Sequence, residues 1–167
     1  FEFGTTVACS SWPFSFDDFK QYDWVGARWK WVKSPNAPHA FGGNGAFSLR
    51  SRDAMIAALR AWIPPLRGNE DTVLVRTLFE DKDNRISNNL GRKPLLAPPN
   101  ISEIFAAEEM FDSTRIYPPL GVYHLLRTVP PTNRTALLRA CPEARLLFEP
   151  LHDPRCALRC PHDPTLL

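Results

Sequence analysis

Apolar side chains recur at helical spacing in the segment that follows residue 51. They are Ala54, Met55, Ala58, Leu59 and Trp62. Ser51 is a favourable N-cap, and the Pro64-Pro65 pair ends the pattern because proline disfavours a helical residue before it. The segment therefore predicts a helix over residues 52–62.

Three further segments predict helices. Residues 70–79 carry Val73, Leu74, Thr77 and Leu78 on one face behind a possible N-cap at Asn69. Residues 16–21 predict a short helix, with Ser15 as its cap and two aspartates in its first turn. Residues 132–139 begin with a threonine that can cap a third helix.

Short β-rich runs lie between these helices. Residues 3–9, 22–25 and 46–49 predict strands, and Gly26 is expected to end the second of them. Residues 118–124 predict a loop leading into a strand, and residues 104–111 fit a strand or a short helix. Residues 28–41 predict a polar loop, and residues 80–93 predict an exposed charged stretch. Strands that alternate with helices predict an α/β or α+β domain.

The chain divides in two on this pattern. Residues 1–140 form the predicted domain, and residues 141–167 predict a Pro- and Cys-rich tail because the periodicity is lost there. Residues 1–9 resemble a strand entered at its middle and lack the features of a signal peptide. We therefore expect a fragment that lacks an upstream part.

Composition narrows the classes of partner. Hydrophobic residues make up 44% of the chain and charged residues 23%, as in ordinary globular domains. A net charge of +2 is too small to indicate nucleic acid as a partner. No apolar run reaches the roughly 18 residues that span a bilayer, so we expect no membrane segment.

The cysteines and histidines leave several possibilities open. Cysteines at positions 9, 141, 156 and 160 do not fix the redox compartment, whereas two N-glycosylation patterns, at Asn100 and Asn133, favour a secretory route through the ER or Golgi lumen. The tail also carries four possible zinc ligands. They are His152, Cys156, Cys160 and His162. Their spacing is unusual for structural zinc, and a loose tail or a disulfide to Cys141 fits as well.

Two local motifs are candidates for chemistry. The run GGNGAFSLRSR at residues 42–52 combines glycines that allow close approach of a ligand with a strand that fixes the loop, although a plain glycine turn is the simpler explanation. Glu70-Asp71 starts a predicted helix, where carboxylates are stabilised by the helix dipole. This pair is either a first-turn cap or a catalytic base for an acceptor hydroxyl.

Taken together, these motifs resemble a known arrangement. A glycine loop, a strand, a helix and then Glu-Asp is similar to the order found in GT-A glycosyltransferases of the β-1,3-galactosyltransferase type. The chain more closely resembles domain-of-unknown-function family 5672. The matching blocks are FKQYDWVGARW at 19–29, GGNGAFSLRSRDAM at 42–55, NED at 69–71, FAAE at 105–108 and PLGVYH at 119–124.

The resemblance implies a GT-A-like, Rossmann-like α/β fold, truncated at its N-terminal side. It also implies transfer of a sugar from a nucleotide-sugar donor to a hydroxyl of a glycan or glycoconjugate, with Mn²⁺ or Mg²⁺ on the diphosphate. Asp71 would be the base, Glu70 its neighbour or an acceptor anchor, and His124 a metal or diphosphate ligand. The substrate would be bound by the following residues: Trp29, Gly43, Asn44, Gly45, Arg50 and Arg52.

The same resemblance leaves a second function open. Thr5 stands about where the family has an acidic metal-binding residue, and Arg28 replaces the proline of its GAPW block. A catalytically degenerate module that binds a carbohydrate or a partner through the same fold is therefore the alternative to an active transferase.

Overall fold

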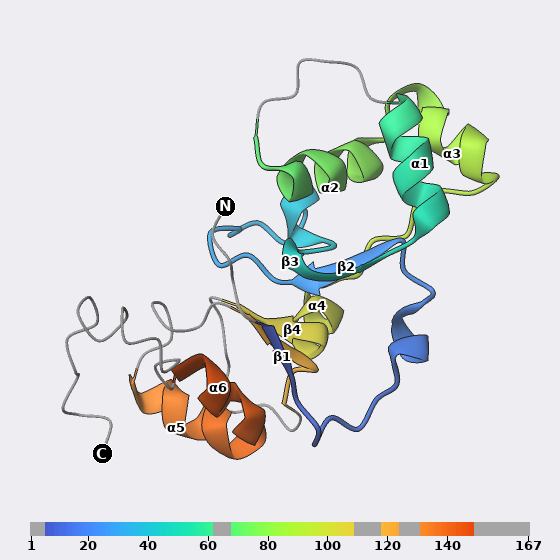
Figure 1. The fold of residues 1–167 in the computed structure, drawn as a ribbon. Coiled ribbons are helices and arrows are strands. Elements are labelled where there is room, and N and C mark those ends of the chain that lie inside the picture. The colour runs from blue at the N-terminus through green and yellow to red at the C-terminus, as the bar shows by residue number, and fades with distance from the viewer. Residues whose placement is uncertain (1–5, 62–67, 109–117, 124–130, 149–167) are drawn as a thin grey trace, which may run out of the picture.

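The computed structural model describes residues 6–61, 68–108, 118–123 and 131–148. The fold is mixed α/β, with short strands and helices in several layers (Figure 1). The strands are β1 (Thr6–Ala8), β2 (Trp24–Ala27), β3 (Asn44–Arg50), β4 (Ala106–Ala107) and β5 (Gly121–Tyr123).

The α-helices are α1 (Arg52–Ala61), α2 (Glu70–Glu80), α3 (Arg85–Leu90), α4 (Pro99–Phe105), α5 (Pro131–Ala140) and α6 (Arg145–Phe148). Short 3₁₀ helices connect them. These are η1 (Phe16–Phe19), η2 (Pro38–Ala40), η3 (Lys82–Asn84) and η5 (Pro142–Ala144).

The described strands form two small sheets. In one sheet β5 lies in the middle, antiparallel to β1 and parallel to β4. In the other sheet β2 pairs antiparallel with β3, and the segment around Leu96 runs parallel to β2 on its other edge. Figure 1 shows α1, α2 and α3 above the β2–β3 sheet, and β1, β4 and α4 below it.

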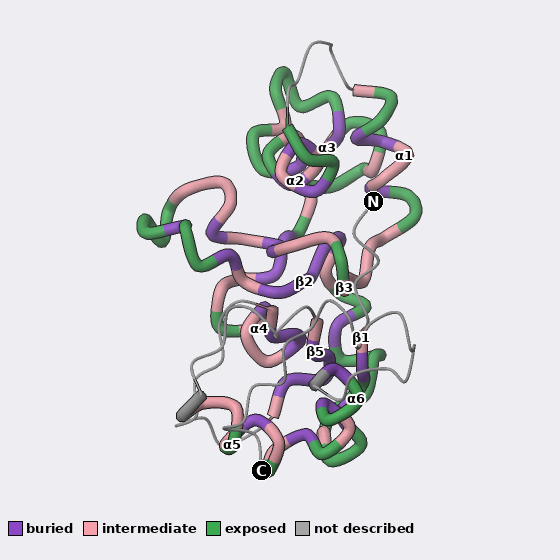
Figure 2. The backbone as a smooth tube through the Cα atoms, turned by 60° about the vertical axis from the view of Figure 1, so that its left-hand side comes forward, coloured by how far each residue is buried: buried purple, intermediate pink, exposed green. Residues whose placement is uncertain are grey.

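Strand β2 divides the core into two layers. Successive side chains of a strand point to opposite faces, so Trp24 and Val25, both fully buried, enter different clusters. Trp24 packs under α1, α2 and α3 with small and apolar side chains such as Ala58 and Leu78. Val25 packs on the other face against α4, beside Phe105. Figure 2 shows buried residues along β2 and exposed residues on parts of the helices above it.

A third cluster joins β1 and β5 to the C-terminal helices. It contains Val7, Val122, Leu137 and Leu147, and it includes a disulfide between Cys9 and Cys141. Since η5 and α6 belong to this cluster, the packed part of the chain extends past the boundary that the sequence predicted at residue 141. The remainder of the predicted tail lies outside the described residues.

Most predicted elements are present, with two corrections. Strand β2 continues through Gly26 to Ala27, so the prediction that Gly26 ends the strand is wrong. The charged stretch 80–93 contains α3, whose Ile86 is buried. Its cap comes from a distance along the chain, because the Asp81 carboxylate accepts the Ile86 N–H at 2.7 Å. Among the described residues, no helix is long and apolar enough to cross a bilayer.

An ion pair between buried Asp23 and half-exposed Arg92 fixes the start of β2. Asp23 is 1% exposed and its carboxylate accepts two hydrogen bonds from Arg92, at 2.6 and 2.8 Å, and one from the Leu95 N–H at 2.7 Å. Burial alone raises the pKa of Asp23, but these hydrogen bonds outweigh it and hold the pKa below its usual value. The folded state therefore binds this proton less readily than the unfolded chain.

We expect Asp23→Asn to lower the free energy of unfolding at pH 7 by about 2 kcal/mol. A lowered carboxylate pKa stabilises the fold above the unfolded pKa of about 4, and this stabilisation is lost as the pH falls through the lower folded pKa. The difference between Asp23→Asn and wild type should thus shrink from pH 6 to pH 2.5, as measured by denaturant unfolding. Asp17→Asn is the control, since the exposed Asp17 carboxylate pairs with the exposed Lys20 side chain. If Asp23→Asn lowers the free energy of unfolding by the same amount at pH 6 and at pH 2.5, the ion pair does not lower the pKa of Asp23 as described.

Candidate functional site

The glycine run forms a bulge in β3. Trp24, Val25 and Gly26 pair in regular register with Arg50, Leu49 and Ser48, but the next residue, Ala27, pairs with Asn44. Residues 45–47 therefore protrude from the ladder, which is what a β-bulge does when it redirects side chains near a site. The Ser48 hydroxyl closes the bulge by donating to the Gly45 carbonyl at 2.9 Å.

Two glycines allow the chain to pass through this crowded place. Gly43 has a φ of +84°, which side chains rarely adopt, and its carbonyl accepts a hydrogen bond from the Trp24 indole at 2.9 Å. Gly45 lies against α2, where a Cβ atom would come within 2.8 Å of the Asp71 Cβ atom. The sequence predicted that these glycines allow a ligand to approach closely. In the structure, the close contacts at Gly43 and Gly45 are made by other parts of the chain itself.

Arg50 holds the bulge and the helix together. Its Nη2 donates to the Gly45 carbonyl and to Glu70 Oε1, both at 2.9 Å, and its Nε donates to the Ser48 hydroxyl at 2.8 Å. The guanidinium also lies 4.0 Å from the centre of the Trp24 ring, in a cation–π contact. Arg50 therefore positions Glu70 and the bulge, and it is not among the residues that line the pocket described below.

Asp71 lies in the first turn of α2, nearly buried at 6% exposure. Its Oδ2 accepts the Gly45 N–H at 3.1 Å, and its Oδ1 accepts the Thr72 N–H at 2.7 Å. The free amides and the dipole at a helix start stabilise a carboxylate in this position. Each carboxylate oxygen can accept a second hydrogen bond, so Asp71 keeps the capacity to bind a ligand hydroxyl.

A pocket of about 540 Å³ opens beside this turn. Its walls come from the β3 bulge, from α2 and from the ends of β4 and β5. The lining residues are Asn44, Gly45, Ala46, Asn69, Glu70, Asp71, Glu108 and Tyr123. Three carboxylates, two amides and a phenol among eight residues make this a polar site that favours ligands rich in hydroxyl groups.

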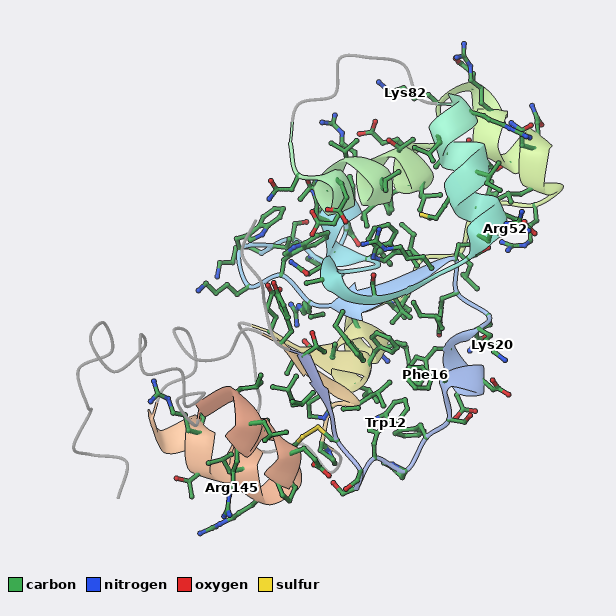
Figure 3. All side chains as sticks on the ribbon, viewed as in Figure 1. Trp12, Phe16, Lys20, Arg52, Lys82 and Arg145 are labelled. Carbon is green, nitrogen blue, oxygen red and sulfur yellow. A yellow bond between two sulfur atoms is a disulfide. The ribbon has the colours of Figure 1, made fainter. Side chains whose placement is uncertain are left out.

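The structure brings four predicted site residues to the pocket and places two others, Trp29 and Arg52, elsewhere. Asn44, Gly45, Glu70 and Asp71 line it. Trp29 is 5% exposed and belongs to the core under α2. Arg52 is exposed at the start of α1, away from the first turn of α2 (Figure 3).

The remaining predicted site residues either lie near the pocket or are outside the described residues. Gly43 adjoins the pocket through its neighbour Asn44 but does not line it. His124 lies outside the described residues, as do Thr5 and the cysteine–histidine group of the tail.

Four lining residues were not predicted as site residues. They are Ala46, Asn69, Glu108 and Tyr123. Glu108 directly follows β4, and Tyr123 is the last residue of β5. The two strands are parallel neighbours, so their carboxyl ends meet at one edge of the sheet, where ligands of α/β proteins commonly bind. Glu108 belongs to the FAAE block that resembles the family, and this block was the sequence signal that could have indicated Glu108 as a site residue.

The described residues do not supply a metal centre. No group of three or more His, Cys, Asp or Glu side chains within residues 6–61, 68–108, 118–123 and 131–148 is arranged to hold a metal ion. We therefore derive no step through Mn²⁺ or Mg²⁺.

Comparisons with known proteins identify the family. No match was found among curated proteins or among solved structures. One family model matches residues 7–122, which include the bulge, α2 and every residue that lines the pocket up to Glu108. The chain thus belongs to DUF5672, a family of proteins of unknown function.

Proposed function

We propose that the chain is the acceptor-binding and catalytic part of a GT-A-like glycosyltransferase, with Asp71 as the catalytic base. The observation that carries the proposal is the Asp71 carboxylate, which forms part of the pocket wall and is held by the N–H groups of Gly45 and Thr72. A base fixed in this way needs no reorganisation when it meets a substrate.

The proposed reaction follows from that placement. An acceptor hydroxyl donates its hydrogen bond to Asp71, and its oxygen attacks the anomeric carbon of the donor sugar. The new glycosidic bond forms as the bond to the diphosphate breaks, and the leaving nucleoside diphosphate takes that electron pair. Asp71 takes the hydroxyl proton. Glu70, oriented by Arg50, accepts a hydrogen bond from another hydroxyl of the acceptor sugar.

A second candidate, a carbohydrate-binding module without transfer, is favoured by the charge of the pocket. Its described lining holds three carboxylates and no lysine or arginine side chain. Carboxylates repel a diphosphate, whereas they accept hydrogen bonds from neutral sugars. The proposed transferase therefore uses this pocket for the acceptor, and its donor must be bound by other groups.

The disulfide supports the expected secretory location. Cys9 and Cys141 lie 132 residues apart, and disulfides persist in oxidising compartments such as the ER lumen. The first N-glycosylation pattern begins at Asn100, an exposed residue in the first turn of α4. These features agree with the lumenal setting in which glycosyltransferases of this type would act.

We expect Asp71→Asn to lower the rate of sugar transfer by about 10²–10⁴-fold, the usual contribution of a general base. Stability should fall by only about 1 kcal/mol, because an amide keeps one of the two acceptor atoms. Release of nucleoside diphosphate from UDP- and GDP-sugars, with a glycan acceptor mixture, measures the rate. Thermal unfolding measures the stability.

Asp53→Asn is the matched control, since Asp53 is an exposed aspartate in the first turn of α1. It should leave the rate unchanged and lower stability by about 0.5 kcal/mol, the contribution of an exposed carboxylate at a helix start. If Asp71→Asn keeps full activity, Asp71 is not the base. If the wild-type chain binds glycans in calorimetry but neither binds nor consumes nucleotide sugars, with or without Mn²⁺, the binding module replaces the transferase.

A further inference from the structure

An exposed tryptophan lies on the loop between β2 and η2. Trp31 is 51% exposed, which is unusual for so large an apolar side chain. Its ring lies 5.6 Å from that of Trp29 and 5.2 Å from that of His39, and these two rings lie 5.7 Å apart. The three rings form one aromatic group that presents part of the Trp31 indole to solvent.

This aromatic group is anchored on both sides. Trp29 is 5% exposed and belongs to the core cluster under α1 and α2. His39 lies in η2, and its Nε2 is 3.3 Å from the Thr72 carbonyl oxygen. The Trp31 ring is thus held by packing against neighbouring rings, which lowers the entropy that it loses when a ligand binds.

The anchor also places the group at the start of α2, whose first residues line the pocket. Thr72 follows Asp71 in the first turn of α2, and its N–H donates to the Asp71 carboxylate. Trp31 reaches this end of α2 through His39, which contacts both the Trp31 ring and the Thr72 carbonyl oxygen. A ligand that fills the Asp71 pocket and extends towards η2 therefore approaches the exposed indole.

The chemistry of the two surfaces selects a saccharide. A pyranose ring has one face of C–H groups, which packs on an indole, and hydroxyl groups at its edge, which donate to carboxylates. A nucleobase also stacks on tryptophan, but its attached phosphates would face the three carboxylates of the pocket lining. A neutral sugar satisfies both surfaces.

We propose that Trp31 is the stacking platform for a sugar ring of the acceptor, one residue along the saccharide from the ring held at Asp71. This inference rests on the proposed function, because it names the class of acceptor and a subsite for it. Trp31 lies outside every sequence block that resembles the family, so the resemblance does not assign it a role.

The test compares Trp31→Ala with Trp31→Tyr. The panel of probes is cellobiose, chitobiose and lactose, followed by a glycan array, with binding measured by calorimetry and by quenching of tryptophan fluorescence. Loss of a stacking ring should weaken saccharide binding by roughly ten-fold, and tyrosine should restore most of it. In transfer assays Trp31→Ala should raise the acceptor KM and leave kcat nearly unchanged, unlike Asp71→Asn.

Phe16→Ala is the control, because Phe16 is 49% exposed but lies in the segment before β2, far from α2 (Figure 3). It should bind saccharides as the wild type does. Thermal unfolding confirms that the variants fold.

Three results overturn the inference. The first is that Trp31→Ala binds saccharides as tightly as the wild type does. The second is that the wild-type chain binds no saccharide. The third is that Trp31→Ala loses affinity for UDP but not for saccharides. The failure of the proposed transferase has a different signature. In that case nucleotide sugars are not consumed, while saccharide binding still depends on Trp31.

Discussion

Removing the Cys9–Cys141 disulfide is expected to lower the free energy of unfolding by about 3–5 kcal/mol. The bond closes a loop of 132 residues, so it strongly restricts the unfolded chain. Both cysteines are at most 3% exposed and contact the cluster formed by β1, β5, α5 and α6. A loss of this size is a large share of the 5–15 kcal/mol that stabilises a typical domain.

The measurement is denaturant unfolding of the Cys9→Ala/Cys141→Ala double variant, compared with the wild type under oxidising and reducing conditions. Reduction should destabilise the wild type and leave the double variant unchanged. The residues around the pocket should be destabilised less than the C-terminal helices. The rate of amide hydrogen exchange should therefore rise first in α5. Equal stability of variant and wild type would show that the bond does not restrict the unfolded chain as argued.

Replacing Gly26 with alanine is expected to cost about 3 kcal/mol, at the upper end for overpacking. A Cβ atom at Gly26 would overlap the Asn44 carbonyl oxygen, and this backbone atom cannot rotate away as a side chain can. Relief requires β2 and β3 to separate at the bulge. The same movement displaces Asn44 and Gly45 from the pocket wall, so saccharide affinity should fall together with stability.

Gly91→Ala is the informative control for Gly26→Ala. Gly91 has a φ of +68°, but a Cβ atom there would meet nothing within 4 Å. Its cost is the backbone strain alone, about 1 kcal/mol. Denaturant unfolding and calorimetry with a bound saccharide distinguish the two variants. If Gly26→Ala loses no more stability than Gly91→Ala and binds as the wild type does, the close approach at the bulge is not rigid.

The elements with strong periodicity were predictable. Helices α1, α2 and α5 agree closely with the ranges that their apolar spacing and caps predicted. Helix α3 was missed because it has a single buried apolar residue, Ile86, and because its cap, Asp81, lies before an intervening 3₁₀ turn. The disulfide was not predictable, since four cysteines allow several pairings and the spacing of Cys9 and Cys141 carries no local signal.

The site was predictable on one side only. The glycine run and the Glu70-Asp71 pair lie together as the order of motifs indicated, and Gly45 touches Asp71 directly. The opposite wall comes from β4 and β5, which are two and three residues long. Strands this short show no alternation to read, so their parallel pairing, which brings Glu108 and Tyr123 to the pocket, appears only in three dimensions.

The bulge in β3 has two sides, and residues on each side make contacts that support the pocket. Its Gly45 and Ala46 form pocket wall, while the ring of Phe47 packs beside Phe105 and over Gly121, where any added Cβ atom would overlap it. A larger residue at position 121 would push Phe47, and with it the Gly45 N–H that holds Asp71. Protein engineers who wish to alter ligand preference at this pocket should therefore vary positions 47 and 121 as a pair, since libraries that randomise the pocket wall alone leave its support unchanged.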